Sequence, residues 1–198
     1  MHHFIRPLLI AAVTAGAALT LTAAPTTQPA APQAKPASRP ATQPTVQVGK
    51  PAPAFTLHNQ ADKPVKLSDL KGQWVVLYFY PKDFTSGCTT EACEFRDGIE
   101  QFKGVKAVIV GVSPDTAESH QKFIDQYKLP FTLLADPDHK VMTEYGAYVP
   151  GKDGKPGKIV RSTVLINPEG VVVYQWSPVK PAGHAAEVKK KLDESRGA

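Results

Sequence analysis

The alternation of apolar and polar residues predicts a folded body in which strands and helices take turns along the chain. The run Trp74–Tyr80 is continuously apolar and aromatic, and its length and β-branched content predict a central strand buried on both faces of a sheet. A second buried strand is expected at 107–112. Two more, 160–166 and 171–176, are separated by Asn-Pro-Glu-Gly and predict a hairpin. Shorter strands are expected at 54–57 and 64–67.

Three helices are expected around these strands. The first begins near Cys88, and its apolar positions follow the helical spacing of four, three, four and three residues. These positions are Cys88, Ala92, Phe95, Ile99 and Phe102. Asp115 is expected to cap the second helix, which ends before Pro130, and the last helix runs over 183–194. Because strands that alternate with helices imply parallel crossovers, we expect an α/β protein with a thioredoxin-like fold, a central mixed β-sheet flanked by helices.

The N-terminal quarter of the chain has a different amino-acid composition. A short polar start with Arg6 precedes an uncharged apolar stretch that ends in small residues at Ala24, and this pattern is typical of a signal peptide over 1–24. Proline recurs every three or four residues among Ala and Thr in 25–47, which predicts an extended linker. The folded domain is therefore expected at 48–198.

This leader predicts a location outside the cytoplasm. If it is cleaved, we expect an exported protein, in a bacterium a periplasmic one, with no stable membrane contact. The alternative is an uncleaved anchor, because about 18 apolar or small residues lie near the lower limit for spanning a bilayer. The domain would then be tethered on the outer side of the membrane.

The charge of the chain is concentrated in the same N-terminal part. The formal net charge is +5, yet residues 1–50 contain four basic residues and no acidic ones, which leaves the body almost neutral. A nucleic-acid-binding surface based on net charge is therefore not expected. Two cysteines also exclude a disulfide-stapled scaffold and a four-cysteine zinc site.

The candidate chemistry lies in the segment PKDFTSGCTTEAC, residues 81–93. Cys88 follows a strand and a Gly-containing loop and opens a helix, where free N–H groups and the helix dipole favour a thiolate over a thiol. Thr85 can direct its hydroxyl at the molecule that the thiolate attacks. A peroxide needs this arrangement, because the thiolate attacks one oxygen while donors stabilise the departing one. The product on sulfur would be a sulfenic acid.

Cys93 lies five residues after Cys88. In an ideal helix the two are separated by about 140° and by a rise of about 7.5 Å, too far for a disulfide, whose Cα atoms lie within about 7 Å. Cys93 therefore suits a resolving thiol that acts through local unfolding. The combination of loop, helix start and cysteine pair disfavours a chance pair of structural thiols. Glu91 is expected to cap this helix, and His120 to have a structural role.

Long segments of the body resemble a known family. They are GKPAPAFTL at 49–57, LSDLKGQWVVLYFYPKDFTSGCTTEACEFRD at 67–97, GVSPD at 111–115, LPFTLLADPD at 129–138, RSTVLINPEG at 161–170 and GHAAEVKKKL at 183–192. Over residues 47–194 the sequence resembles the peroxiredoxins, and within them the Q-type group that includes bacterioferritin comigratory protein. It departs from the usual pattern at Ser86, where the family commonly has proline.

The resemblance assigns roles to particular residues. The family motif PxxxTxxC falls on Pro81, Thr85 and Cys88, and the downstream active-site arginine falls on Arg161. This implies that Cys88 is the peroxidatic cysteine and Cys93 the resolving one. Pro81 would shield the site, while Thr85 and Arg161 would orient the peroxide and stabilise the thiolate.

The function implied is that of a monomeric, thiol-dependent peroxidase. It would reduce hydrogen peroxide and organic hydroperoxides through a Cys88–Cys93 disulfide, which thioredoxin or a similar dithiol would reduce, without a metal or an organic cofactor. Two alternatives are a general thiol–disulfide oxidoreductase and a non-enzymatic secreted domain with a structural disulfide. Peroxide consumption by Cys88→Ser and Cys93→Ser variants separates the three.

Overall fold

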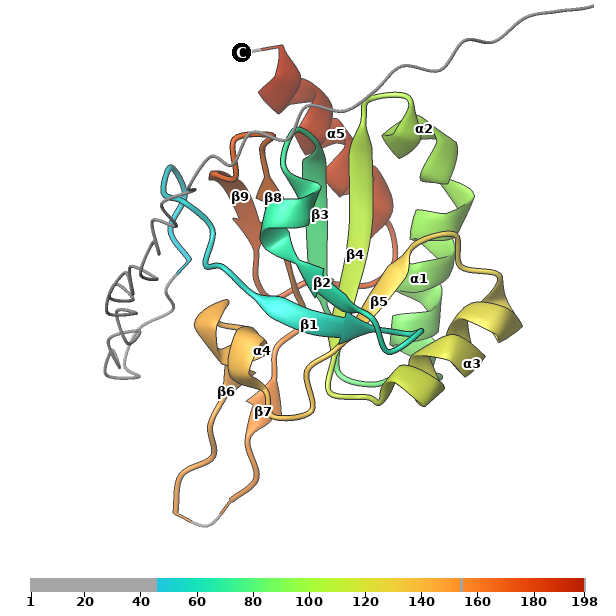
Figure 1. Ribbon diagram of the computed structural model, residues 1–198, viewed down its shortest axis with the longest axis vertical. Coiled ribbons are helices and arrows are strands. Elements are labelled where there is room, and N and C mark those ends of the chain that lie inside the picture. Colours follow the sequence, from blue (N-terminus) through green and yellow to red (C-terminus); the bar gives the residue numbers. More distant parts are fainter. Residues whose placement is uncertain (1–45, 154, 198) are drawn as a thin grey trace, which may run out of the picture. The chain divides into compact units, whose positions relative to one another are not determined.

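A computed structural model describes residues 46–153 and 155–197 (Figure 1). The predicted signal peptide and most of the predicted linker lie outside the described residues. The strands are β1 Thr56–Asn59, β2 Pro64–Lys66, β3 Trp74–Phe79, β4 Ala107–Ser113, β5 Thr132–Ala135, β6 Tyr148–Val149, β7 Lys158–Ile159, β8 Ser162–Ile166 and β9 Val172–Trp176. The helices are α1 Ser86–Asp97, α2 Ile99–Lys103, α3 Ala117–Tyr127, α4 Lys140–Glu144 and α5 His184–Arg196, with a 3-10 turn η1 at Leu67–Leu70.

Seven of the strands form one sheet in the order β2-β1-β5-β4-β3-β8-β9. β3, β4 and β5 are parallel, whereas β8 is antiparallel to β3 and to β9, and β1 is antiparallel to β5. The expected mixed sheet is therefore confirmed, with β3 near its middle and β8–β9 as the antiparallel edge. Nearly all of β3 is buried, as its continuous apolar sequence predicts.

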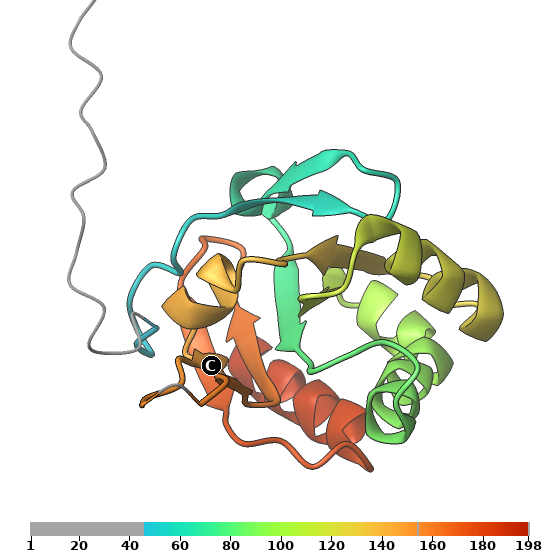
Figure 2. The same ribbon diagram turned by 90° about the horizontal axis from the view of Figure 1, so that it is seen from below.

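The two faces of the sheet are covered by different elements (Figures 1 and 2). Alternate residues of β3, beginning with Val76 and Tyr78, pack against α1, α2, α3 and α5. The residues between them, including Val75 and Leu77, pack against α4, η1 and the β1–β2 hairpin. This alternation follows from the pleat of the strand, because successive side chains point to opposite faces.

Several short elements were not predicted. β5, α4 and the β6–β7 hairpin each contain two to five residues per element, too few for a helical or alternating pattern to show. The first predicted helix is also divided into two, because the helix is interrupted at Gly98, between α1 and α2. The cap of α3 is Thr116, whose side chain accepts from the Ser119 N–H, so the prediction of Asp115 was wrong by one residue.

The N-terminal end of the described chain attaches to the start of β9. The N–H of Gly49 donates to the Val172 carbonyl at 2.8 Å, and the N–H of Val172 donates to the Lys50 carbonyl at 2.9 Å. Val46 is buried, so packing begins two residues before the predicted start of the domain. Within the described ranges, no helix has the length and apolar content needed to cross a membrane.

Candidate active site

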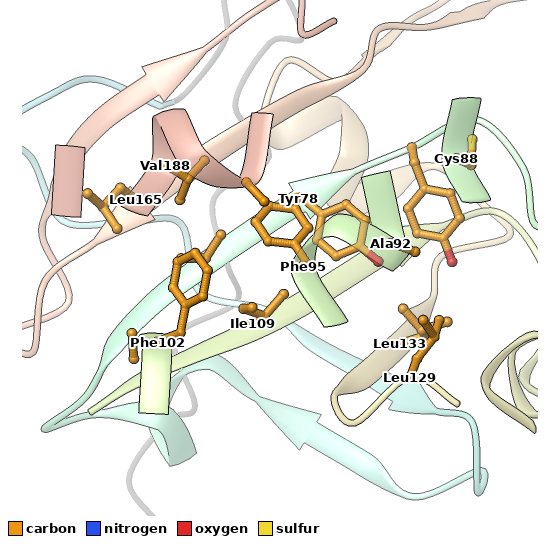
Figure 3. Packing of buried hydrophobic residues seen from close by; sticks show 14 of the residues in the cluster. Tyr78, Cys88, Ala92, Phe95, Phe102, Ile109, Leu129, Leu133, Leu165 and Val188 are labelled. Carbon is orange, nitrogen blue, oxygen red and sulfur yellow. The ribbon is translucent and has the colours of Figure 1, made fainter. Parts of the chain in front are cut away.

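Cys88 lies in the first turn of α1, directly after the loop that follows β3. Thr85 is the N-cap residue, so Cys88 is the third residue of the helix. The first N–H groups of a helix have no partner within it, and together with the helix dipole they favour negative charge on a nearby sulfur. The Cys88 side chain is buried, at 2% exposure, and Figure 3 shows it on the side of α1 that also carries Ala92 and Phe95.

Arg161 reaches this sulfur from a distant part of the chain. The antiparallel register of β3 and β8 pairs Phe79 with Ser162, which places residue 161 beside the loop that precedes α1. The Arg161 Nη2 atom donates to the Cys88 Sγ at 3.0 Å. A guanidinium keeps its charge at all physiological pH values, so this contact places a permanent positive charge against the Cys88 sulfur.

Glu91 holds the other side of the same guanidinium. The Arg161 Nη1 atom donates to Glu91 Oε2, and the Glu91 side chain is fully buried. The prediction that Glu91 caps α1 is therefore wrong, because its position one turn into the helix directs the carboxylate at Arg161. Burial raises the pKa of Glu91 to about 7, although the charge of Arg161 acts in the opposite direction. Among the described atoms, Glu91 Oε1 has no hydrogen-bond partner.

Gly87 makes the approach of Arg161 possible. A Cβ atom at this position would lie 3.4 Å from Arg161 Nη2 and 3.3 Å from Pro181 Cγ. The contact with Pro181 is tighter than ordinary van der Waals packing and the contact with Arg161 is at its short limit, so a side chain at this position would crowd the guanidinium.

Tyr78 is a buried aromatic residue close to the Arg161–Glu91 ion pair. Its ring stacks on Tyr80 at 5.3 Å between centroids. It also packs against Phe95 at 5.2 Å, and Figure 3 shows these two rings side by side. Burial, followed by the negative charge of Glu91, raises the pKa of Tyr78 well above its usual value, so its hydroxyl stays protonated. Gly111 on β4 is required here, because a Cβ atom would lie 2.7 Å from the Tyr78 ring.

The loop between β3 and α1 contains Pro81 and Thr85. Thr85 donates its hydroxyl to the Lys82 carbonyl at 2.9 Å, which leaves the oxygen lone pairs of the side chain available to a ligand. Pro81 is half-buried at the start of the loop. Phe84 has φ of 61°, in the left-handed region that a bulky side chain rarely adopts, and such local strain is typical of functional loops.

A buried polar network fixes this loop. Asp83 accepts hydrogen bonds from the hydroxyls of Tyr80, at 2.7 Å, and Ser119, at 2.8 Å, and lies 2.9 Å from His120 Nδ1. Its own N–H donates to Asp115 at 2.8 Å. His120 therefore has the structural role that the sequence suggested, whereas the part played by Asp83 was missed. The only signal in the sequence was its position inside the loop.

Cys93 lies on the same helix as Cys88. Both thiols are free, Cys88 buried and Cys93 partly exposed, so the cysteines do not form a structural disulfide in this fold. Ideal helical geometry separates their Cα atoms by about 8.7 Å, which is longer than a disulfide allows. Within residues 46–153 and 155–197, no group of three or more His, Cys, Asp or Glu side chains is arranged to hold a metal ion.

A cysteine in the first turn of a helix, on a thioredoxin-like sheet and with an arginine on its sulfur, defines a thiol-based oxidoreductase. Residues 48–175 match the AhpC/TSA family, and the chain belongs to this family, within the Bcp and Q group of peroxiredoxins. It is accordingly a thiol-dependent peroxidase of the atypical 2-Cys type. The resemblance drawn from the sequence motifs is confirmed.

The similarity extends over the whole described body. The chain is 47% identical over 152 residues to "Peroxiredoxin Bcp" of Bacillus subtilis, which covers 76% of this chain and 97% of that protein. It is 41% identical over 194 residues to "Peroxiredoxin Q, chloroplastic" of Oryza sativa subsp. japonica, covering 94% of this chain and 88% of that protein.

Solved structures give the same result. A crystal structure of Xylella fastidiosa peroxiredoxin Q with a cysteine-to-serine substitution has a TM-score of 0.71 at 34% identity, covering 76% of this chain and 98% of that chain. Peroxidoxin BcpB from Mycobacterium tuberculosis has a TM-score of 0.70 at 32% identity, covering 75% of this chain and 97% of that chain.

Proposed function

We propose that Cys88 is the peroxidatic cysteine and Cys93 the resolving cysteine of this peroxidase. The observation that carries the proposal is the 3.0 Å contact between Arg161 Nη2 and the Cys88 sulfur, at a helix start that favours a thiolate. The Cys88 thiolate attacks the terminal oxygen of a hydroperoxide, its O–O bond breaks, and one oxygen stays on sulfur. The remaining oxygen takes up a proton and leaves as water or an alcohol.

The other site residues act on the peroxide rather than on sulfur alone. Thr85 uses its free lone pairs to accept the peroxide O–H, which aligns the O–O bond with the sulfur. The positive charge of Arg161 stabilises the departing oxygen, and Glu91 keeps its guanidinium in place while Gly87 leaves room for it. Pro81, at the mouth of the loop, limits the access of water to the thiolate.

The second half of the cycle uses Cys93. The Cys93 thiol condenses with the Cys88 sulfenic acid, which forms the disulfide and releases water. An external dithiol of the thioredoxin type then reduces this disulfide and becomes oxidised itself. Substrates are hydrogen peroxide and organic hydroperoxides, in line with the alkyl peroxide reduction named for the Xanthomonas campestris bacterioferritin comigratory protein, which is 35% identical to this chain.

The test is peroxide consumption by three proteins, wild type, Cys88→Ser and Cys93→Ser, with a protein dithiol of the thioredoxin type as the only reductant. Wild type is expected to turn over and Cys88→Ser to be inactive. Cys93→Ser should consume one equivalent of peroxide and then need a reductant that attacks the sulfenic acid directly. Equal consumption by wild type and Cys88→Ser would overturn the whole proposal, whereas full turnover by Cys93→Ser would remove only the role of Cys93.

We also propose that the mature enzyme is exported, in a bacterium to the periplasm, and is monomeric. The support is the uncharged apolar stretch before Ala24, the proline-rich segment after it and the nearly neutral body. Cell fractionation with N-terminal sequencing of the purified protein tests the export and the cleavage. Light scattering on the reduced protein tests the monomer, and a mass of twice the mature chain would contradict it.

A further inference from the structure

Disulfide formation requires α1 to come apart between its two cysteines, so the contacts that hold each half of this helix matter. The first half is anchored by the buried contacts among Cys88, Arg161 and Glu91. In the second half, Phe95 is fully buried in the core. Two charged residues next to Cys93 also bind this half to neighbouring helices.

Glu94 binds the second half of α1 to α5. Its two carboxylate oxygens accept from the Gly183 N–H at 2.8 and 2.9 Å. Gly183 is the N-cap residue of α5, so the carboxylate lies at the positive end of that helix dipole. A negative charge is favourable at this end and satisfies an N–H that has no partner within the helix.

Arg96 binds the same half of α1 to α3. Its Nη1 donates to the Tyr127 carbonyl at 2.8 Å, and Tyr127 is the last residue of α3. A cation is favourable at this negative end of a helix. The pKa of Arg96 is raised, first by its hydrogen bond to Asp97 and also by the nearby Cys93. The guanidinium is therefore charged and lies beside the thiol that must be released.

We propose that Glu94 and Arg96 are two clamps that set how fast Cys93 is released to meet the Cys88 sulfenic acid. Each clamp joins a charge next to Cys93 to the helix end of opposite sign, and both must open when this part of α1 unwinds. The inference rests on the proposed role of Cys93 as resolving thiol. Glu94 and Arg96 are thus positioning residues, because their hydrogen bonds run to Gly183, Tyr127 and Asp97 and not to the Cys88 sulfur.

The clamps also decide the fate of the sulfenic acid. While they are closed, the sulfur of this acid can attack a second hydroperoxide, whose O–O bond breaks, so that one more oxygen is bonded to sulfur and the other leaves as water or alcohol. The product is a sulfinic acid, which ends the cycle. Faster release of Cys93 favours the disulfide over this reaction, so tight clamps make the enzyme sensitive to excess peroxide.

The test compares Glu94→Ala and Arg96→Ala with wild type in a single turnover stopped by a thiol-alkylating quench and resolved by intact mass. Alanine is the best helix former, so faster unwinding in these variants cannot come from helix propensity. Disulfide formation is expected to accelerate roughly tenfold in each, because each variant loses a charge-assisted hydrogen bond. The rate of the first reaction of Cys88 with peroxide should stay within about twofold.

Two further variants sharpen the result. Arg96→Lys keeps the charge and a donor for the Tyr127 carbonyl, so it should behave close to wild type. Glu118→Ala removes an exposed ion pair with Lys122 on α3 and serves as the matched control. The peroxide concentration that converts half of Cys88 to sulfinic acid should rise in Glu94→Ala and Arg96→Ala and stay constant in the control.

Unchanged disulfide formation in Glu94→Ala would overturn the proposal. Slower formation in Arg96→Ala beside faster formation in Glu94→Ala would also overturn it, because Arg96 would then act on the thiol rather than as a clamp. An equal change in both reaction steps would overturn it as well, because it would indicate a general loosening of the fold rather than the release of Cys93. Failure of the proposed function looks different, since wild type itself would then form no Cys88–Cys93 disulfide.

Discussion

Replacement of Glu91 by glutamine tests how the active site holds a buried carboxylate. Burial raises the pKa of Glu91 from 4.5 to about 7, against the attraction of Arg161. Between these values the unfolded chain loses its proton while the folded protein keeps it. The free energy of unfolding therefore falls as the pH rises from about 4.5 to about 7, and the shift of about 2.5 units corresponds to about 3 kcal/mol.

Glutamine has nearly the same shape and does not titrate. Relative to Glu91→Gln, wild type should therefore lose about 3 kcal/mol of its free energy of unfolding between pH 4.5 and pH 8. Urea unfolding followed by circular dichroism, with reductant to keep both thiols free, measures this difference at each pH. Other titrating groups are shared by both proteins and cancel in it.

The matched control is Glu118→Gln, an exposed glutamate on α3 whose pKa is lowered by its hydrogen bond to Lys122. Relative to Glu118→Gln, wild type should not lose stability over the same pH range. A lowered pKa in the folded protein makes the free energy of unfolding rise with pH, whereas a raised one makes it fall. If the difference in the free energy of unfolding between wild type and Glu91→Gln stayed constant across this pH range within about 1 kcal/mol, the argument that burial disfavours the charged form of Glu91 would be refuted.

Three further predictions concern the reaction of Cys88 with peroxide, measured by stopped flow. Arg161→Met should slow it roughly 100- to 1,000-fold, since the donor 3.0 Å from the sulfur is lost; a smaller effect than in Arg161→Lys would contradict this role. Thr85→Val should slow it roughly 100-fold while Thr85→Ser stays within a few fold, and equal rates would exclude the hydroxyl. Gly87→Ala should slow it several-fold without lowering Tm, because alanine favours the helix by about 1 kcal/mol while its Cβ crowds Arg161. A lower Tm at an unchanged rate would contradict this last prediction.

The long buried elements could be predicted because their patterns are local. β3 is a continuous apolar run and β8 ends in one, and the predicted bounds of both strands differ from the observed ones by at most two residues. The cysteine at the start of α1 could be predicted for the same reason, since strand, loop and helix follow one another directly. The pairing of Arg161 with Glu91 could not be derived from local pattern, because it depends on the register between β3 and β8, whose paired residues lie 83 to 91 positions apart.

The polar network around Asp83 could not be predicted for a related reason. Its partners come from the end of β3, the end of β4 and the first turn of α3, which meet only when the parallel crossover is complete. The sequence does place an acidic residue in the loop, but an exposed loop aspartate has the same local signature. The error at Glu91 is similar. A helix that began near Cys88 would have Glu91 in its first turn, but α1 begins at Ser86, so Glu91 lies beyond the first turn and faces the buried Arg161.

The attachment of the N-terminal segment to β9 has a practical consequence. Val172 pairs with Ile166, which pairs with Val75 near the start of β3, whereas Cys88 follows the other end of that strand. From Val75 to Phe79 the strand alone extends about 13 Å. If this enzyme were joined to a surface or to a fusion partner directly before Gly49, its thiol would therefore lie at the end of β3 away from the attachment. The same enzyme joined near Gly183, where α5 begins beside the clamp on α1, would have its resolving helix held by the support.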